Sequence, residues 1–280
     1  MRINDTFERL RRGEAVFGCA LQCYRSAEVP RALAAAGFDY VFIDVEHGGF
    51  GVETVQDMVE AAVRAGITPL VRVGELLYSL VARSLDVGAQ GIILPRVEDP
   101  CLLRTALSWM KFPPEGCRGF GVLPPLLDFK QHPFDAVMEH LNRHTMAVVQ
   151  FETAAAMERA EELLRTGSVD VAMVGPSDLS ISLGVPGDFS HPVLVSTIRR
   201  FIRQCEAAGV VPGIHCRDLE QAEFWLRQGM RFVGAGGEHR FLLERAREVA
   251  QQLRRAALEC GVRAEPRGGE ANRKTEVEPS

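Results

Sequence analysis

The sequence predicts an α/β protein whose fold class is a closed (β/α)8 barrel. Short apolar runs rich in β-branched residues alternate along the chain with longer stretches of helical periodicity. The number of these units comes near eight. All of them fit within 280 residues, which favours one closed barrel over an open doubly wound sheet.

Eight strands are expected, and each is followed by a stretch suited to a helix. The strands are predicted at residues 16–21, 40–44, 68–73, 91–95, 146–151, 169–174, 211–215 and 232–234. The clearest helices are predicted at 52–65 and 192–208, where apolar residues recur with helical spacing. In a barrel of this kind the carboxyl ends of the strands meet at one mouth, where active sites lie.

Two segments depart from this alternation. Prolines and glycines cluster between residues 111 and 145, which predicts a long loop with a short helix inside it, and such an excursion is able to cover an active site. Residues 259–280 are polar and lack apolar periodicity, which predicts a disordered tail. Residues 1–258 are therefore expected to form a single domain.

Composition and charge exclude several classes of protein. The net charge is −5 and the two signs are interspersed, unlike the clustered basic surface of a nucleic-acid binder. The seven cysteines are scattered without a Cys-x-x-Cys pair, which indicates reduced thiols and a cytoplasmic protein. No signal core and no apolar run long enough to cross a bilayer is present, so no membrane association is expected.

Polar residues stand at the predicted carboxyl ends of four strands. If the barrel forms, these side chains converge on one pocket. They are Asp44, Glu46 and His47 in FIDVEH, Arg72 in PLVRV, Gln150 and Glu152 in VVQFE, and Asp178 in VGPSD.

Glu152 and Asp178 are the candidate metal ligands. Two carboxylates from separate strands leave most of the coordination sphere of a hard cation open to water and to an oxygen-rich substrate, which suits magnesium or manganese. A 2-oxo acid can chelate such a cation, which then stabilises the enolate formed when a carbon–carbon bond breaks. The alternative is structural: Glu152 caps the helix expected at 154–165, and Asp178 caps a turn.

His47 and Arg72 are the candidate catalytic residues. A histidine titrates near neutrality and can serve as a general base, particularly beside a carboxylate. An arginine is permanently charged and can hold negative charge that develops on an enolate oxygen. The alternative is a network of acidic residues, Arg72 and His47 on the surface of the protein.

Six ordered motifs resemble the HpcH/HpaI aldolase family. They are GFDYVFIDVEHG, PLVRV, LDVGAQGIILPRVE, FPPEGCRGFG, VVQFET and VGPSDLSISLG, and the resemblance runs from about residue 16 to about residue 253. It implies a barrel of the phosphoenolpyruvate/pyruvate type that assembles as a homo-oligomer, usually a hexamer with exchanged C-terminal helices. The implied activity is a metal-dependent aldol cleavage of a 4-hydroxy-2-oxo acid to pyruvate and an aldehyde.

The resemblance also assigns roles to individual residues. It implies that His47 is the base, that Arg72 stabilises the transition state and that Asp86 raises the basicity of His47. Gln150 contacts the substrate, the backbone of Ser177 touches the substrate carboxylate, and Glu152 and Asp178 bind the metal. The implied cofactor is a divalent cation, magnesium or manganese with cobalt as a further candidate, and no organic cofactor.

The chain departs from the family pattern at three places: after Arg72, after Gly121, and at Glu238, where an aspartate is common. These departures leave the aldehyde half of the substrate open. Two other functions also remain open. One is a citrate-lyase-type enzyme that cleaves a CoA thioester, and the other is a barrel that binds a 2-oxo acid without turning it over.

Overall fold

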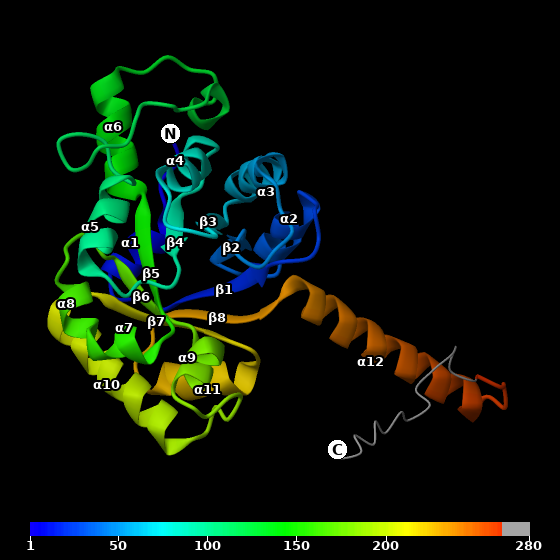
Figure 1. Cartoon of the computed structure of the whole chain (residues 1–280). Coiled ribbons are helices and arrows are strands. Elements are labelled where there is room, and N and C mark those ends of the chain that lie inside the picture. Colours follow the sequence, from blue (N-terminus) through cyan, green and yellow to red (C-terminus); the bar gives the residue numbers. More distant parts are fainter. Residues whose placement is uncertain (265–280) are drawn as a thin grey trace, which may run out of the picture. The chain divides into compact units, whose positions relative to one another are not determined.

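The computed structural model describes residues 1–264 and contains a closed barrel of eight parallel strands in sequence order (Figure 1). This confirms the predicted fold class. The strands are β1 (Val16–Leu21), β2 (Tyr40–Asp44), β3 (Thr68–Arg72), β4 (Gly91–Leu94), β5 (Met146–Phe151), β6 (Val171–Val174), β7 (Val211–Cys216) and β8 (Phe232–Gly237).

Most predicted strand limits hold to within one or two residues, and the largest difference is at β8. This strand extends three residues past the predicted end at 234, through Ala235, Gly236 and Gly237. Three of its last four residues are glycines, which offer no side-chain pattern for a prediction. Pairing with β1 on one side and β7 on the other keeps this backbone in the sheet.

The helices that lie within residues 1–239 surround the barrel, and the described chain also contains a last helix, α12 (Glu238–Glu259). Those around the barrel are α1 (Asp5–Arg11), α2 (Glu28–Ala35), α3 (Val52–Ala65), α4 (Tyr78–Asp86), α5 (Pro100–Ser108), α6 (Phe134–His144), α7 (Ala154–Glu158), α8 (Ala160–Leu164), α9 (Pro176–Ser182), α10 (Pro192–Ala208) and α11 (Leu219–Arg227), with a 3-10 turn η1 (Pro124–Leu127). The helix expected at 154–165 is divided into α7 and α8 at Arg159.

The barrel interior is filled by side chains rather than left as a pore. Tyr40 and Phe232 stack with their ring centroids 4.1 Å apart, and both are fully buried. A Cβ at position 18 would lie 2.2 Å from the Tyr40 ring, so Gly18 provides the space that this tyrosine occupies. Phe7 and Leu10 of α1 belong to the same interior cluster. The polar chemistry is therefore confined to the ends of the barrel.

The long segment between α5 and β5 lies at the amino end of the barrel. It contains η1 and α6, and Leu126 of η1 packs on Gly88 just ahead of β4. Arg118 of the same segment binds Asp86 at the end of α4. Because the segment leads from a helix into the next strand, it packs at the amino ends of β4 and β5. Its contacts with Gly88 and Asp86 thus lie away from the strand-end residues of the same chain, and a role over an active site stays a prediction.

The described chain divides into a compact unit, Met1–His239, and a second unit that begins at Arg240. In α12, whose first two residues belong to the first unit, Glu238 is the buried residue. Exposed apolar side chains of α12 include Leu242, Leu253 and Leu258. The predicted boundary at residue 258 stays a prediction, and most of the predicted tail, 265–280, lies outside the described residues. Within residues 1–264, none of the helices combines the length and the apolar character that a membrane span requires.

Candidate active site

An ion pair between Asp44 and Arg72 forms the floor of the site. Asp44 ends β2 and Arg72 ends β3, and the two residues are directly paired in the sheet. Arg72 donates from Nη2 to Asp44 Oδ2 at 2.6 Å and from Nε to Oδ1 at 3.0 Å. Both residues are buried. Burial raises the pKa of Asp44, but the hydrogen bonds and the charge of Arg72 outweigh it and hold this pKa below its usual value.

Asp44 also shapes the loop that carries His47. Its Oδ1 accepts hydrogen bonds from the backbone N–H groups of Glu46 and His47, both at 3.1 Å. A Cβ at position 48 would lie 2.1 Å from the Asp44 carbonyl oxygen, so the tight turn requires Gly48. The His47 side chain remains 52% exposed, which leaves its imidazole accessible to a small molecule.

Glu152 stands across the mouth from this loop and is held by two donors. Its Oε1 accepts from the backbone N–H of Arg96 at 2.9 Å, and its Oε2 accepts from the side-chain amide of Gln150. The side-chain oxygen of Gln150, Oε1, in turn accepts a hydrogen bond from Arg72 Nη1 at 3.4 Å. Hydrogen bonds therefore connect the ends of β2, β3 and β5 across the mouth of the barrel.

Glu46 joins the same network from the β2 loop. Its Oε2 lies 3.3 Å from Arg72 Nη1, and its Oε1 lies 3.2 Å from Arg96 Nε. His47 Nε2 lies 3.8 Å from Glu46 Oε2, which is too long for a hydrogen bond. Glu46 is thus a carboxylate that lies beside the His47 ring without a direct hydrogen bond to it.

Negative charge is concentrated around Glu152. Burial raises the pKa of Glu152 most, the hydrogen bonds from Gln150 and Arg96 lower it, and the charges of Glu46 and Asp178 raise it further. Asp178, in the first turn of α9, is therefore close enough to repel Glu152. A site rich in carboxylate oxygens is the donor set of a hard divalent cation, so these residues fit a cation of that class.

Gly175 lets Glu152 and Gln150 approach the start of α9. A Cβ at position 175 would lie 3.0 Å from Glu152 Oε2 and 3.1 Å from Gln150 Nε2. The φ angle of Gly175 is −96°, so the glycine is required by space rather than by backbone conformation. Ser177 is exposed in the same turn, next to Asp178.

Asp86 lies apart from the other predicted site residues. It is the last residue of α4, ahead of β4, and its Oδ1 accepts from Arg118 Nη2 at 2.8 Å. A Cβ at position 121 would come within 2.5 Å of Asp86 Oδ2. Asp86 is therefore at the amino end of the barrel, whereas His47 follows the carboxyl end of β2, and the expected pairing of the two does not occur within one chain.

Three further polar residues that follow strand ends at the same end of the barrel were not predicted as site residues. Arg96 follows β4 with a φ angle of +52°, Gln22 follows β1 and donates to Asp44 Oδ2 at 2.8 Å, and Glu238 follows β8. The same placement just past a strand end that selected Glu152 applies to all three. Polar residues therefore follow the carboxyl ends of more strands than the four for which the sequence predicted site residues.

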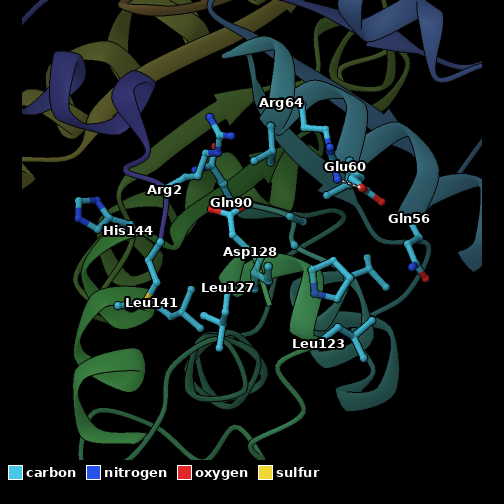
Figure 2. A pocket seen from close by; sticks show the side chains of 18 of the residues that line it. Arg2, Gln56, Glu60, Arg64, Gln90, Leu123, Leu127, Asp128, Leu141 and His144 are labelled. Carbon is cyan, nitrogen blue, oxygen red and sulfur yellow. Dashed lines mark hydrogen bonds and ion pairs between the residues drawn. The ribbon is translucent and has the colours of Figure 1, made fainter. Parts of the chain in front are cut away.

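A separate pocket lies at the opposite end of the barrel (Figure 2). Leucines of η1 and α6 line it together with Arg2, Gln90 and His144. Arg64 donates to Glu60 at 2.6 Å on its rim. This pocket contains neither of the predicted metal ligands, so it is not the candidate metal centre.

Comparison with known proteins gives a consistent result. A model of the family described as HpcH/HpaI aldolase/citrate lyase matches residues 24–244. A 2-dehydro-3,6-dideoxy-6-sulfogluconate aldolase from Pseudomonas putida is 30% identical over 245 residues, covering 88% of this chain and 95% of that protein. A 2-keto-3-deoxy-L-rhamnonate aldolase from Escherichia coli O17:K52:H18 is 31% identical over 233 residues, covering 83% and 86%.

A solved structure shows the same relationship. An HpcH/HpaI aldolase/citrate lyase family protein from Burkholderia cenocepacia J2315 superposes with a TM-score of 0.83 at 31% identity, covering 90% of this chain and 99% of that one. Sequence and fold therefore agree over nearly the whole described chain.

Proposed function

Because the chain belongs to the HpcH/HpaI aldolase/citrate lyase family, we propose that it is a class II aldolase that cleaves a 4-hydroxy-2-oxo acid to pyruvate and an aldehyde. The relatives named above act on 2-keto-3-deoxy acids. Such acids carry the ketone at carbon 2 and a hydroxyl group at carbon 4. We propose the same class of substrate here.

The observation that carries this proposal is the charge arrangement at the mouth. Glu152 is buried and surrounded by the charges of Glu46 and Asp178, while Arg72 presents Nη1 to the same space. We propose Glu152 and Asp178 as the ligands of a divalent cation, with magnesium or manganese favoured by the oxygen donors. When bound, the cation would supply Lewis-acid stabilisation of negative charge on the substrate oxygens.

His47 is proposed as the base. Its exposed imidazole would take the proton of the substrate 4-hydroxyl group, directly or through a water molecule. The electron pair of that O–H bond then forms the aldehyde carbonyl, and the bond between carbons 3 and 4 breaks. The electron pair of the broken bond moves toward the ketone oxygen to give the enolate of pyruvate. Protonation of carbon 3 completes the product.

Arg72 is proposed to hold the developing enolate charge. Asp44 occupies the Nε and Nη2 edge of its guanidinium group, which leaves Nη1 to face the mouth. Gln150, which lies 3.4 Å from this nitrogen, is proposed to contact the same part of the substrate. The Ser177 backbone, at the start of α9, is proposed to bind the substrate carboxylate.

Asp86 can assist His47 only if it belongs to a second copy of the chain, because the two lie at opposite ends of one barrel. We therefore propose a homo-oligomer in which copies meet near the active site. The exposed leucines of α12 are further candidates for contact between copies. We also propose that the enzyme works in the cytoplasm, since its cysteines are unpaired thiols among the described residues.

The direct test is pyruvate release from a panel of 4-hydroxy-2-oxo acids. We expect cleavage that is lost after exhaustive chelation and restored by Mn²⁺ or Mg²⁺. Full activity in metal-free protein would contradict the mechanism. Cleavage of a malyl or citramalyl CoA thioester in place of these acids would instead favour the thioester lyase. Absence of deuterium exchange into the methyl group of pyruvate, with metal present, would favour a barrel that only binds 2-oxo acids.

A further inference from the structure

A second group of potential metal ligands lies at the junction of the first and last strands. Cys23 follows β1, and Glu238 and His239 follow β8. The thiol sulfur, a carboxylate oxygen and an imidazole nitrogen of these residues all lie within 4.8 Å of one another. We propose that Cys23, Glu238 and His239 bind a zinc ion, at a site separate from Glu152 and Asp178.

Glu238 is the strongest part of this argument. Its Oε1 accepts hydrogen bonds from the backbone N–H groups of Gln22, Cys23 and Tyr24 at 2.9, 2.5 and 3.1 Å. These three backbone donors fix the position of that oxygen. The Oε2 atom of Glu238 is buried without a hydrogen-bond partner, and the side chain is only 3% exposed. A buried anionic oxygen without a partner is costly, and a cation beside it removes that cost.

His239 supplies the next ligand. Its Nδ1 is buried, lacks a hydrogen-bond partner and lies 3.6 Å from Glu238 Oε2. The imidazole lies against Gly237, where a Cβ would come within 3.0 Å of the ring. The unpartnered nitrogen and the unpartnered oxygen thus face the same small space, although neither donates to the other.

The donor types select the metal. Thiolate, imidazole and carboxylate together suit zinc, whose bonds to these ligands are about 2.0 to 2.3 Å and tetrahedral, which places neighbouring ligand atoms about 3.4 Å apart. The 3.6 Å between His239 and Glu238 already matches this spacing. Cys23 is exposed, so its side chain is free to close on the ion. Three protein ligands leave the fourth position for water or for a substrate oxygen.

The site is distinct from the proposed catalytic centre in place and in chemistry. Its residues follow β1 and β8, whereas Glu152 and Asp178 follow β5 and β6, on the far side of the eight-stranded barrel. It contains sulfur and nitrogen donors, whereas the catalytic ligands are carboxylates. The proposal is therefore independent of the aldolase function. The competing arrangement is an ion pair between a protonated His239 and Glu238, with Cys23 a free thiol.

Cobalt substitution tests the site by its spectrum. Metal-free, reduced full-length protein is titrated with Co²⁺, and we expect an intense thiolate-to-cobalt charge-transfer band in the near ultraviolet. The band should vanish in Cys23→Ser and remain in the control Cys101→Ser, which changes an exposed thiol of α5. It should also remain in the Glu152→Gln/Asp178→Asn double variant. Absence of the band in the unmodified protein, or its persistence in Cys23→Ser, would overturn the proposal.

Zinc affinity and thiol protection give a second measurement. His239→Gln should weaken Zn²⁺ binding about tenfold or more by removing one ligand, and it avoids the folding risk of changing Glu238. Bound Zn²⁺ should slow alkylation of Cys23, read by peptide mass spectrometry, while Cys101 and Cys260 react at unchanged rates. Equal alkylation of Cys23 with and without Zn²⁺ would contradict the metal site.

Discussion

Both ends of the barrel contain carboxylates that are at least partly withdrawn from solvent, but the two ends differ in the positive charge that faces these carboxylates. At the amino end, Asp86 pairs with Arg118 at 2.8 Å, and the charge of Lys111 acts on Asp170. At the carboxyl end, Arg72 is engaged by Asp44, while Glu46, Glu152 and Asp178 share the remaining space with Arg96. Each of these amino-end carboxylates has a basic residue acting on it, whereas the carboxyl end keeps an excess of negative charge that a cation can balance.

This difference predicts where substitutions abolish activity and where they change only stability. Glu152→Gln should lower kcat/KM by about a thousandfold, because it removes a proposed metal ligand whose loss affects the transition state directly. Steady-state pyruvate release measures this effect. Asp170→Asn is the matched control at the amino end and should leave kcat/KM within a few-fold of the unmodified value. Similar losses in both variants would remove the functional distinction between the ends.

Arg72→Lys should reduce kcat by about a hundredfold, because the single nitrogen of lysine cannot pair with both Asp44 oxygens and also reach the position that Nη1 occupies at the mouth. The variant should also unfold at lower temperature, since Asp44 loses part of its pairing. Arg64→Lys, on the rim of the amino-end pocket, is the control. If Arg72→Lys raises KM alone and leaves kcat unchanged, Arg72 binds substrate without stabilising the enolate.

Gly175→Ala should weaken Mn²⁺ binding by about tenfold, because the new methyl group displaces Glu152 Oε2 from its position. Titration calorimetry of the metal-free protein gives the affinity. Gly74→Ala is a matched control near the same end, since a Cβ there makes ordinary contact at 3.5 Å from the Val45 carbonyl oxygen. An unchanged Mn²⁺ affinity in Gly175→Ala would show that Glu152 is not a ligand.

The smallest effect concerns the amino end alone. Burial raises the pKa of Asp170 to about 6, against the opposing effects of the Ala147 N–H and the Lys111 charge. A raised pKa means that the folded state favours the protonated form, so this stabilising contribution is present below about pH 4 and is lost as the pH rises through 6. The free energy of unfolding of Asp170→Asn should therefore exceed that of the unmodified protein by on the order of 1 kcal/mol. This difference develops between about pH 4 and pH 6 and persists at higher pH. Urea unfolding at pH 4 and pH 8 measures it, and a pH-independent difference would contradict the assignment.

The sequence was sufficient for the barrel, because eight apolar runs of strand length separated by helical periodicity are difficult to place in any other way. It was also sufficient for the strand-end carboxylates, since parallel strands bring their carboxyl ends together. Glu152, Arg72 and Gln150 do converge, and they do so through hydrogen bonds that spacing alone could not provide. The roles assigned to them stay predictions until tested.

Two expected features lie at the amino end of the barrel for the same reason. The segment at 111–145 and Asp86 both belong to connections from a helix into the next strand, and such connections lie at the amino end of a barrel. Within one chain, both therefore lie away from His47, and the proposed role of Asp86 requires a second copy. Glu238 was missed because β8 was expected to end at residue 234, whereas the strand continues to Gly237 and Glu238 follows it directly. The partners of Glu238 are backbone N–H groups 214 to 216 positions earlier, a contact that no local pattern reports.

That distant contact has a consequence for how the chain is assembled during synthesis. β1 emerges first and β8 last, so both edges of the growing sheet stay open until the end of translation, and open edges invite pairing with other chains. Glu238 then ties the last strand to the residues after the first one and closes the ring. A chain that stops short of Glu238 would leave the ribosome without this closure, and its exposed strand edges would make it a client for chaperones.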